Sequence, residues 1–255
     1  MTGPEEIPLA GGNMNTGVVR VGDTVRRPAG PWTPAVHALL KHLRSTGFRG
    51  APRPLGLDDQ GREVLTYAEG PVVHPDHPET MEPDAALTRV ARLIRDFHDA
   101  VAGFEPPPDA RWQVVIPGDG AEIIAHHDLA PWNLVAGAEW VFIDWDTAAP
   151  GTRLWDLAYA APAFAPLRPG TPRAEAKRRL RLFADAYGLD QQQRKKLAQL
   201  MGPRSRSMYT HLKTQAEQGN QPWARLWHEC HGRVWLAAAD YLDAHAEDWR
   251  AALLA

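Results

Sequence analysis

Short apolar runs dominate the first part of the chain. Runs of β-prone residues separated by the turn signal Gly22-Asp23 predict a strand–turn–strand–turn–strand unit over residues 7–27. A further strand is predicted over 63–67. Between them, apolar residues spaced i, i+3, i+4 and i+7 predict a helix over 33–46, with Thr33 as its N-cap. The first part is therefore expected to be a small sheet with one helix.

The rest of the chain is mainly of helical period. Two short β-prone runs, 134–135 and 140–143, flank Ala136-Gly137-Ala138 and predict a hairpin, because glycine suits a tight turn. The predicted helices lie on either side of that hairpin, at 84–102, 175–187, 191–201, 205–218 and 223–245, with a last turn around Trp249.

Composition narrows the class of protein. The 255 residues allow one large or two smaller domains, and the net charge of −3 gives no reason to expect nucleic-acid binding. A single cysteine, Cys230, excludes an internal disulfide and fits a reducing compartment. No signal peptide or membrane-length apolar run is seen, so a cytoplasmic location away from membranes is expected. The oligomeric state is left open.

Three polar residues carry the chemistry of the hairpin region. Asn133 stands just before the first predicted strand and Asp144 just after the second, so the hairpin brings an amide oxygen and a carboxylate together. Oxygen ligands of this kind suit Mg²⁺. Asp128 lies in the preceding loop, where a carboxylate can accept a proton from an attacking hydroxyl. Taken singly, these residues would more often be turn and cap residues.

Three motifs in order resemble the aminoglycoside phosphotransferase family, which is related to the protein kinases. They are His126-x-Asp128-x-x-x-x-Asn133, Asp144-x-Asp146 and Trp155-Asp156-Leu157-Ala158. The resemblance implies a two-lobed kinase-like α+β fold, with a β-rich nucleotide-binding lobe over 1–67 and a mainly helical catalytic and acceptor-binding lobe over 68–255. It implies transfer of the γ-phosphoryl group of ATP or GTP to a small-molecule hydroxyl.

The resemblance also assigns roles in the catalytic lobe. Asp128 would be the base, Asn133 and Asp144 would hold Mg²⁺, and Asp146 would be a second metal ligand or a support. His126 is expected to brace the loop by hydrogen bonding, and His127 to have no chemical role.

The nucleotide side is assigned in the same way. The Gly- and Asn-rich turn with Asn13, Asn15 and Thr16 would cover the phosphates, and the interlobe linker about 66–70 would receive the base through Tyr67 and Ala68. On the next strand Arg26 or Arg27 would bind the phosphates. Strand alternation lets only one of them face the cleft, and the position of the family's cation favours Arg26.

One feature departs from the family. Kinase-like folds carry a glutamate on the first helix to pair with the strand cation, but residues 33–46 contain no acid, and Val36 or His37 occupies that region. Glu63 is a candidate replacement.

The acceptor is left open among antibiotics, sugars, amino alcohols and nucleosides. Thr171–Ala255 has 14 Lys and Arg against 9 Asp and Glu, which disfavours a polycationic aminoglycoside.

Two other functions fit parts of the pattern. A metal-dependent phosphohydrolase could use His98, His126, His127, Asp128 and Asp144 around a transition metal. A non-catalytic nucleotide-binding protein of the same fold would explain the missing helix glutamate but would not need Asp128.

Overall fold

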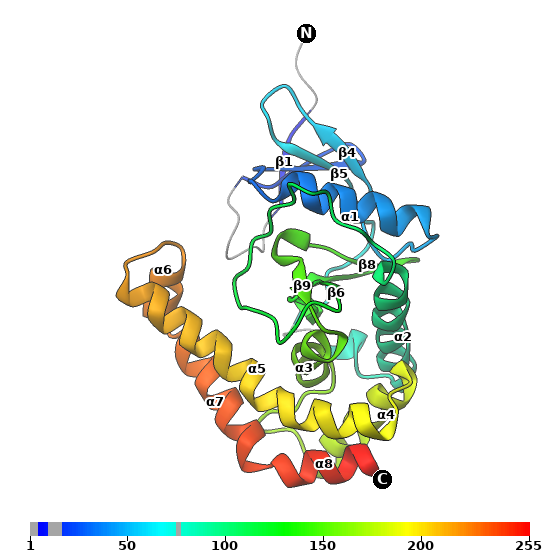
Figure 1. Cartoon of the computed structure of the whole chain (residues 1–255), viewed down its shortest axis with the longest axis vertical. Helices are drawn as coiled ribbons and strands as arrows, with labels where there is room; N and C mark the ends of the chain where they lie inside the picture. Colours follow the sequence, from blue (N-terminus) through cyan, green and yellow to red (C-terminus); the bar gives the residue numbers. More distant parts are fainter. Residues whose placement is uncertain (1–4, 10–16, 75–77) are drawn as a thin grey trace.

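The computed structural model of the chain describes residues 5–9, 17–74 and 78–255. Its first part is a five-stranded antiparallel sheet in the order β1-β2-β3-β5-β4 (Figure 1). The strands are β1 Ile7–Pro8, β2 Val19–Val21, β3 Thr24–Arg27, β4 Pro54–Leu57 and β5 Glu63–Thr66. The strand unit over 7–27 and the strand near 63–67 are thus confirmed within the described residues. The short β4 was not predicted.

The helix α1 (Thr33–Ser45) lies next to this sheet (Figure 1). Its apolar stripe is buried, with Leu39, Leu40 and Leu43 at most 1% exposed. The predicted cap is off by one residue, because Thr33 is already helical and Trp32 is the N-cap. Instead of capping, the Thr33 hydroxyl accepts a hydrogen bond from the backbone N–H of Gly30 at 2.9 Å.

The segment after β5 lies against the hairpin of the second part. A side chain on Gly137 would overlap the carbonyl oxygen of Glu69, and a Cβ on Gly70 would lie 2.6 Å from the Cα of Gly137. Glycine at both positions is what allows the two backbones to approach. The chain then forms a bridge between Val72 and Val135.

The second part is mainly helical and holds two small two-stranded sheets, β6 with β9 and β7 with β8. The short elements are η1 Pro78–Thr80, β6 Ile123–Ala125, η2 Pro131–Asn133, β7 Leu134–Ala136, β8 Trp140–Phe142, η3 Trp145–Thr147 and β9 Ala149–Gly151. The helices are α2 Asp84–Val101, α3 Arg153–Phe164, α4 Arg173–Tyr187, α5 Gln191–Glu217, α6 Trp223–His228, α7 His231–Ala244 and α8 Ala246–Leu254.

Two predicted helix boundaries were wrong. The helices expected at 191–201 and 205–218 form one helix, α5, with Pro203 inside it. Proline removes one backbone hydrogen bond, but α5 packs against α3, α7 and α8, and this tertiary packing keeps it continuous. Conversely, the helix expected over 223–245 is broken at Cys230, whose φ of 67° is left-handed.

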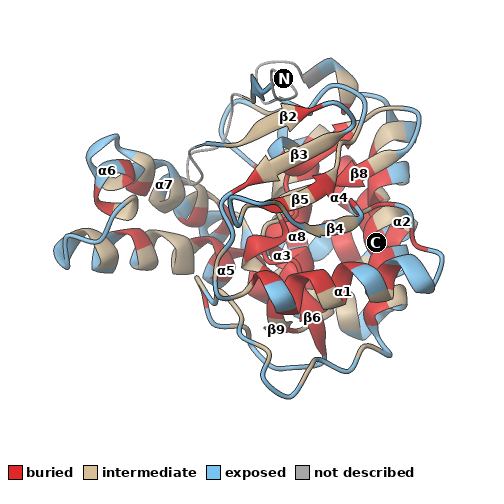
Figure 2. Ribbon diagram, turned by 90° about the horizontal axis from the view of Figure 1, so that it is seen from above, coloured by how far each residue is buried: buried red, intermediate tan, exposed pale blue. Residues whose placement is uncertain are grey.

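One buried core joins the two parts. It includes Leu40 of α1, Phe97 of α2, Phe142 of β8 and Phe164 of α3. Figure 2 shows that buried positions are concentrated in the body of the molecule, while α6 and the adjoining ends of α5 and α7 extend away from it. None of the described helices combines the length and apolar character that a membrane span requires.

Candidate active site

The hairpin has the predicted form. β7 and β8 pair antiparallel, with Leu134 opposite Phe142, and the backbone N–H of Ile143 donates to the Asn133 carbonyl at 2.9 Å. Asn133, at the end of η2, and Asp144, just after β8, therefore stand side by side at the open end of the hairpin. The convergence inferred from the sequence is confirmed as geometry.

Asp144 has an unusual backbone. Its φ of 59° and ψ of 67° are left-handed, which is uncommon for a residue other than glycine. The next residue holds the turn, because the buried Trp145 indole donates to the Phe142 carbonyl at 2.8 Å. The Trp145 ring also packs on Phe97 and His126, with centroids 5.0 and 4.5 Å apart. The strained turn is thus fixed by a buried aromatic anchor, and it presents the Asp144 carboxylate to the space between the two parts.

Both carboxylate oxygens of Asp128 are held. The Tyr159 hydroxyl donates to Oδ1 and the Asn133 amide donates to Oδ2, each at 2.7 Å. Burial raises the pKa of Asp128 above its ordinary value, these two hydrogen bonds oppose that rise, and the negative charge of Asp144 adds to it. A carboxylate with a raised pKa is a stronger proton acceptor.

Asp156, at the start of α3, braces the loop that carries Asp128. Its two oxygens accept the backbone N–H groups of His126 at 3.0 Å and His127 at 2.9 Å. The buried His98 contacts the same carboxylate at 3.2 Å and the Tyr187 hydroxyl at 2.8 Å. Burial would raise the pKa of Asp156, but its contact with His98 and the neighbouring His side chains bring it down to about 2. His98 is therefore a core histidine with both ring nitrogens in contact with a partner.

The two loop histidines behave as expected. The His126 ring lies 3.2 Å from the Ile143 carbonyl and its Nδ1 accepts the backbone N–H of Asp128 at 3.3 Å, so it links the loop to the hairpin. The His127 ring is buried against β9, 3.2 Å from the Ala149 carbonyl, and burial lowers its pKa. Both rings support the structure of the loop.

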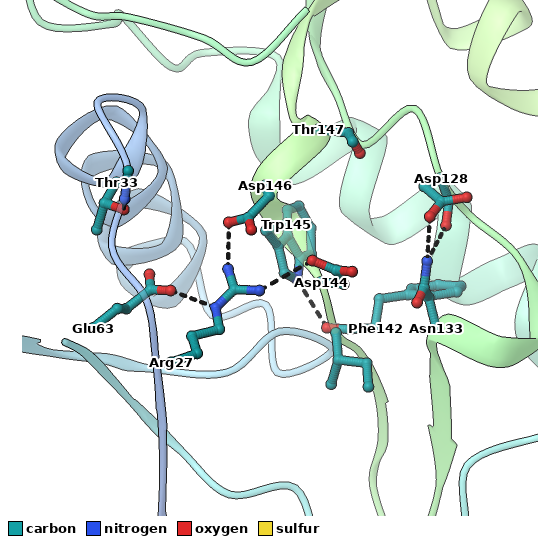
Figure 3. A network of polar contacts seen from close by, with 12 residues as sticks. Arg27, Thr33, Glu63, Asp128, Asn133, Phe142, Asp144, Trp145, Asp146 and Thr147 are labelled. Carbon is teal, nitrogen blue, oxygen red and sulfur yellow. Dashed lines mark hydrogen bonds and ion pairs between the residues drawn. The ribbon is translucent and has the colours of Figure 1, made fainter. Parts of the chain in front are cut away.

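The strand cation at this site is Arg27. Its Nε donates to Glu63 at 2.5 Å, its Nη1 to Asp144 at 3.0 Å and its Nη2 to Asp146 at 2.5 Å (Figure 3). Burial would lower the pKa of Arg27, but the three carboxylates raise it. The guanidinium therefore stays charged and ties β3 to the loop after β8.

The preference for Arg26 was wrong. Alternation does separate the two arginines, but Arg26 contacts Asp58, at 3.4 Å, on the other side of β3. The register with β5 decides the outcome, because it sets Arg27 opposite Glu63 and Arg26 opposite Val64. Glu63 is 1% exposed. It supplies to Arg27 the carboxylate that the first helix lacks, and it is the replacement that the sequence suggested.

The nucleotide side is described only in part. Asn13, Asn15 and Thr16 lie outside the described residues. Tyr67 and Ala68 follow β5 and are half-buried. The Tyr67 ring lies 3.8 Å from the Arg20 guanidinium, and Arg20 also pairs with Glu69 at 2.7 Å. These contacts attach the segment between the two parts to the first sheet.

Two site residues escaped the sequence analysis. Tyr159 lies one helical turn after Asp156 on α3, and that spacing was a signal available in the sequence. Arg204 of α5 gave no such signal. It is 1% exposed, donates to the His127 carbonyl at 2.8 Å and lies 4.6 Å from the Tyr159 ring centroid. Tyr159 holds the Asp128 carboxylate, and Arg204 holds the backbone of the loop that carries it.

The donors at this site fit a hard cation better than a transition metal. Asn133 and Asp144 offer oxygen atoms, and Asp146 is 8% exposed and tied to Arg27. No group of three or more His, Cys, Asp or Glu side chains gathers as a metal site in residues 5–9, 17–74 and 78–255. His98 is engaged by Tyr187 and Asp156 instead. The ligand set that a phosphohydrolase would need is therefore not assembled among these residues.

A cavity of about 570 Å³ is lined by the loop that precedes β6 and by α5, the helix that also carries Arg204. The loop residues Val115, Ile116 and Pro117 form one wall, and Ser207 and Thr210 of α5 lie on the other. The two charged residues at the cavity, Arg206 and Asp243, pair with each other at 2.5 Å.

Comparison with known proteins places the chain in a family. Residues 109–200 match the model of the phosphotransferase enzyme family. The trifolitoxin immunity protein of Rhizobium leguminosarum bv. trifolii is 38% identical over 208 residues, which cover 74% of this chain and 77% of that protein. The chain belongs to the phosphotransferase enzyme family.

Solved structures confirm the kinase-like fold of this phosphotransferase. A choline/ethanolamine kinase family protein from Mesorhizobium loti superposes with a TM-score of 0.66 at 15% identity, covering 99% of this chain and 92% of its own. An amicoumacin kinase bound to AMP-PNP, Ca²⁺ and Ami gives 0.68 at 14%, covering 93% and 89%. The GDP complex of wild-type aminoglycoside 2'-phosphotransferase-IIIa gives 0.61 at 14%, covering 95% and 92%.

Proposed function

We propose that this phosphotransferase moves the γ-phosphoryl group of ATP or GTP to a hydroxyl of a small molecule, with Mg²⁺ as cofactor. The observation that carries the proposal is the position of Asp128. Its carboxylate is held by Tyr159 and Asn133 in a buried loop, beside the Asn133–Asp144 pair. Mere nucleotide binding does not need a base placed in this way.

In the proposed reaction the acceptor oxygen forms a bond to the γ-phosphorus as the bond from that phosphorus to the β,γ-bridging oxygen breaks. Asp128 takes the proton of the acceptor hydroxyl, and the nucleoside diphosphate leaves with the electron pair. Arg27 binds phosphate oxygens as a permanent cation. The protein contributes mainly position and charge.

Mg²⁺ would be held by Asp144 and Asn133, with Asp146 as a support. When bound, it neutralises charge on the phosphates. The Asn133 amide nitrogen is directed at Asp128, which leaves its oxygen as the ligand atom.

The base of the nucleotide would lie against the segment of Tyr67 and Ala68. Relatives of the same fold hold AMP-PNP in one case and GDP in another, so both purines are candidates. Asn13, Asn15 and Thr16 stay candidates for the phosphate-covering turn.

The acceptor is proposed to be a neutral or weakly charged hydroxyl compound. The cavity lined by residues 115–117 and α5 has one positive and one negative side chain, Arg206 and Asp243, which pair with each other. The same helix, α5, holds the Asp128 loop through Arg204. Because one relative is named for immunity to trifolitoxin, a toxic natural product is a specific candidate. Phosphorylation would then inactivate it.

A non-catalytic role loses its main argument. That alternative rested on the missing helix glutamate, and Glu63 fills the same electrostatic role at Arg27 from β5.

Nucleotide binding and transfer test the proposal. Calorimetry is expected to show ATP or GTP binding that Mg²⁺ strengthens. A screen of toxins, sugars and amino alcohols with Mg²⁺ is expected to yield one acceptor whose mass rises by one phosphoryl group. Folded protein that binds neither nucleotide would rule out the proposed function.

A matched pair of variants tests the strand cation. Arg27→Gln is expected to weaken MgATP binding roughly 10- to 100-fold, because a hydrogen bond to a charged group contributes about 1.5–3 kcal/mol. Arg26→Gln is the control and is expected to change it little. Binding is compared by calorimetry at a temperature where circular dichroism shows both variants folded. Equal, small effects would mean that neither arginine meets the nucleotide.

A further inference from the structure

The carboxylate that steadies Arg27 lies on a strand and not on a helix. β3 and β5 pair so that Arg27 and Glu63 stand directly opposite each other. The ion pair between them is buried, with side chains 6% and 1% exposed. It is therefore a cross-strand pair, fixed by the sheet itself.

The helix nevertheless contacts this pair. His37 of α1 lies on the buried face of the helix, and its Nε2 is 2.8 Å from Glu63 Oε1. Glu63 Oε2 is the atom that accepts from Arg27. An ionised carboxylate only accepts, so the His37 Nε2–H is the donor. Each Glu63 oxygen thus has its own buried donor, one from the helix and one from the strand.

The remaining guanidinium nitrogens point the other way. With Nε engaged by Glu63, Nη1 and Nη2 face Asp144 and Asp146 across the boundary between the two parts (Figure 3). The direction of Arg27 therefore depends on the rotamer of Glu63. Burial raises the pKa of Glu63, but the hydrogen bond from His37 and the charge of Arg27 lower it overall, so Glu63 stays ionised.

We propose that His37 is a positioning residue for Arg27, acting through Glu63 as the helix's substitute for a glutamate. The inference rests on the proposed role of Arg27 at the nucleotide phosphates. The two charges of the ion pair reside in the sheet, while α1 supplies a hydrogen bond to it. A displacement of α1 would then disorient Glu63 without breaking the ion pair, and the nucleotide site would weaken rather than disappear.

His37→Ala tests this directly. MgATP affinity is expected to fall roughly 3- to 30-fold, which is the size of effect that a substitution at a residue without ligand contact can have on binding. His37→Gln keeps an N–H donor and is expected to restore most of the affinity. The control is His42→Ala, on the same helix, whose ring contacts the Ala100 carbonyl at 3.0 Å. It removes a comparable hydrogen bond and is expected to leave MgATP affinity unchanged.

A double-variant cycle separates positioning from general stability. If His37 acts through Glu63, then His37→Ala/Glu63→Gln binds MgATP no more weakly than Glu63→Gln alone. Additive losses in this cycle, wild-type affinity in His37→Ala, or an equal loss in His42→Ala would overturn the inference.

A second measurement does not depend on nucleotide. His37 and Arg27 share Glu63 as a partner, so their effects on unfolding temperature are expected to be non-additive in His37→Ala/Arg27→Gln. If the wild type binds no nucleotide, the proposed function fails, and this cycle alone decides the inference. Additive shifts in unfolding temperature would overturn it.

Discussion

Replacing Asp128 by asparagine is expected to lower phosphoryl transfer roughly 10²–10⁴-fold, the usual contribution of a positioned base. The substitution keeps the size of the side chain but removes its charge and its ability to take a proton. Nucleotide–Mg²⁺ affinity is expected to change little, because Asn133 and Asp144 are the proposed ligands. Turnover with the acceptor identified by the screen, together with nucleotide titration, gives both quantities.

Asp119→Asn is a matched control for this variant. Asp119 is also a loop aspartate that accepts from a hydroxyl, that of Thr152, but it is exposed and lies outside the site. It is expected to keep wild-type turnover. Wild-type turnover in a folded Asp128→Asn protein would show that Asp128 is not the base, and the central assignment would fail.

The sequence predicted the parts of the site that are close in the chain. Asn133 and Asp144 flank one hairpin, and a glycine turn with β-prone flanks is enough to bring them together. Asp128 lies in the loop just before Asn133, and the resemblance to a family loop assigned it the role of the base. These are local relations, and local relations leave a clear pattern in a sequence.

Relations set by long-range register left no such pattern. Strand alternation allowed either Arg26 or Arg27 to face the site, and only the pairing of β3 with β5 decides between them. The contact of Arg204 with the His127 carbonyl depends on how α5 packs against a loop that is 77 residues away in the chain. The continuity of α5 through Pro203 is likewise a result of packing that local propensity does not contain.

The brace that Asp156 gives to the Asp128 loop is expected to be the most sensitive point for stability. Asp156→Asn places an amide where both carboxylate oxygens accept hydrogen bonds from backbone N–H groups. One buried N–H would then face another donor, and the contact with His98 would lose its charge. Leaving a buried donor without its acceptor costs about 1–3 kcal/mol and more where the lost partner was charged, so the expected loss in free energy of unfolding is about 3 kcal/mol.

The effect of pH gives this prediction a signature. Asp156 has a pKa of about 2 in the folded protein, below its ordinary value of 3.8. A depressed carboxylate pKa stabilises the fold above the unfolded pKa, and this stabilisation is lost as pH falls through the folded pKa. The gap in unfolding free energy between wild type and Asp156→Asn is therefore expected to narrow by roughly 2 kcal/mol between about pH 4 and pH 2.

Urea unfolding at several pH values measures this gap. Asp185→Asn is the control, because Asp185 is exposed and pairs with Arg194 at the surface of α4. Its gap to wild type is expected to stay within about 1 kcal/mol. A gap for Asp156→Asn that is small at neutral pH would mean that the loop does not depend on this carboxylate. A large gap that does not narrow in acid would mean that Asp156 acts through its shape rather than its charge.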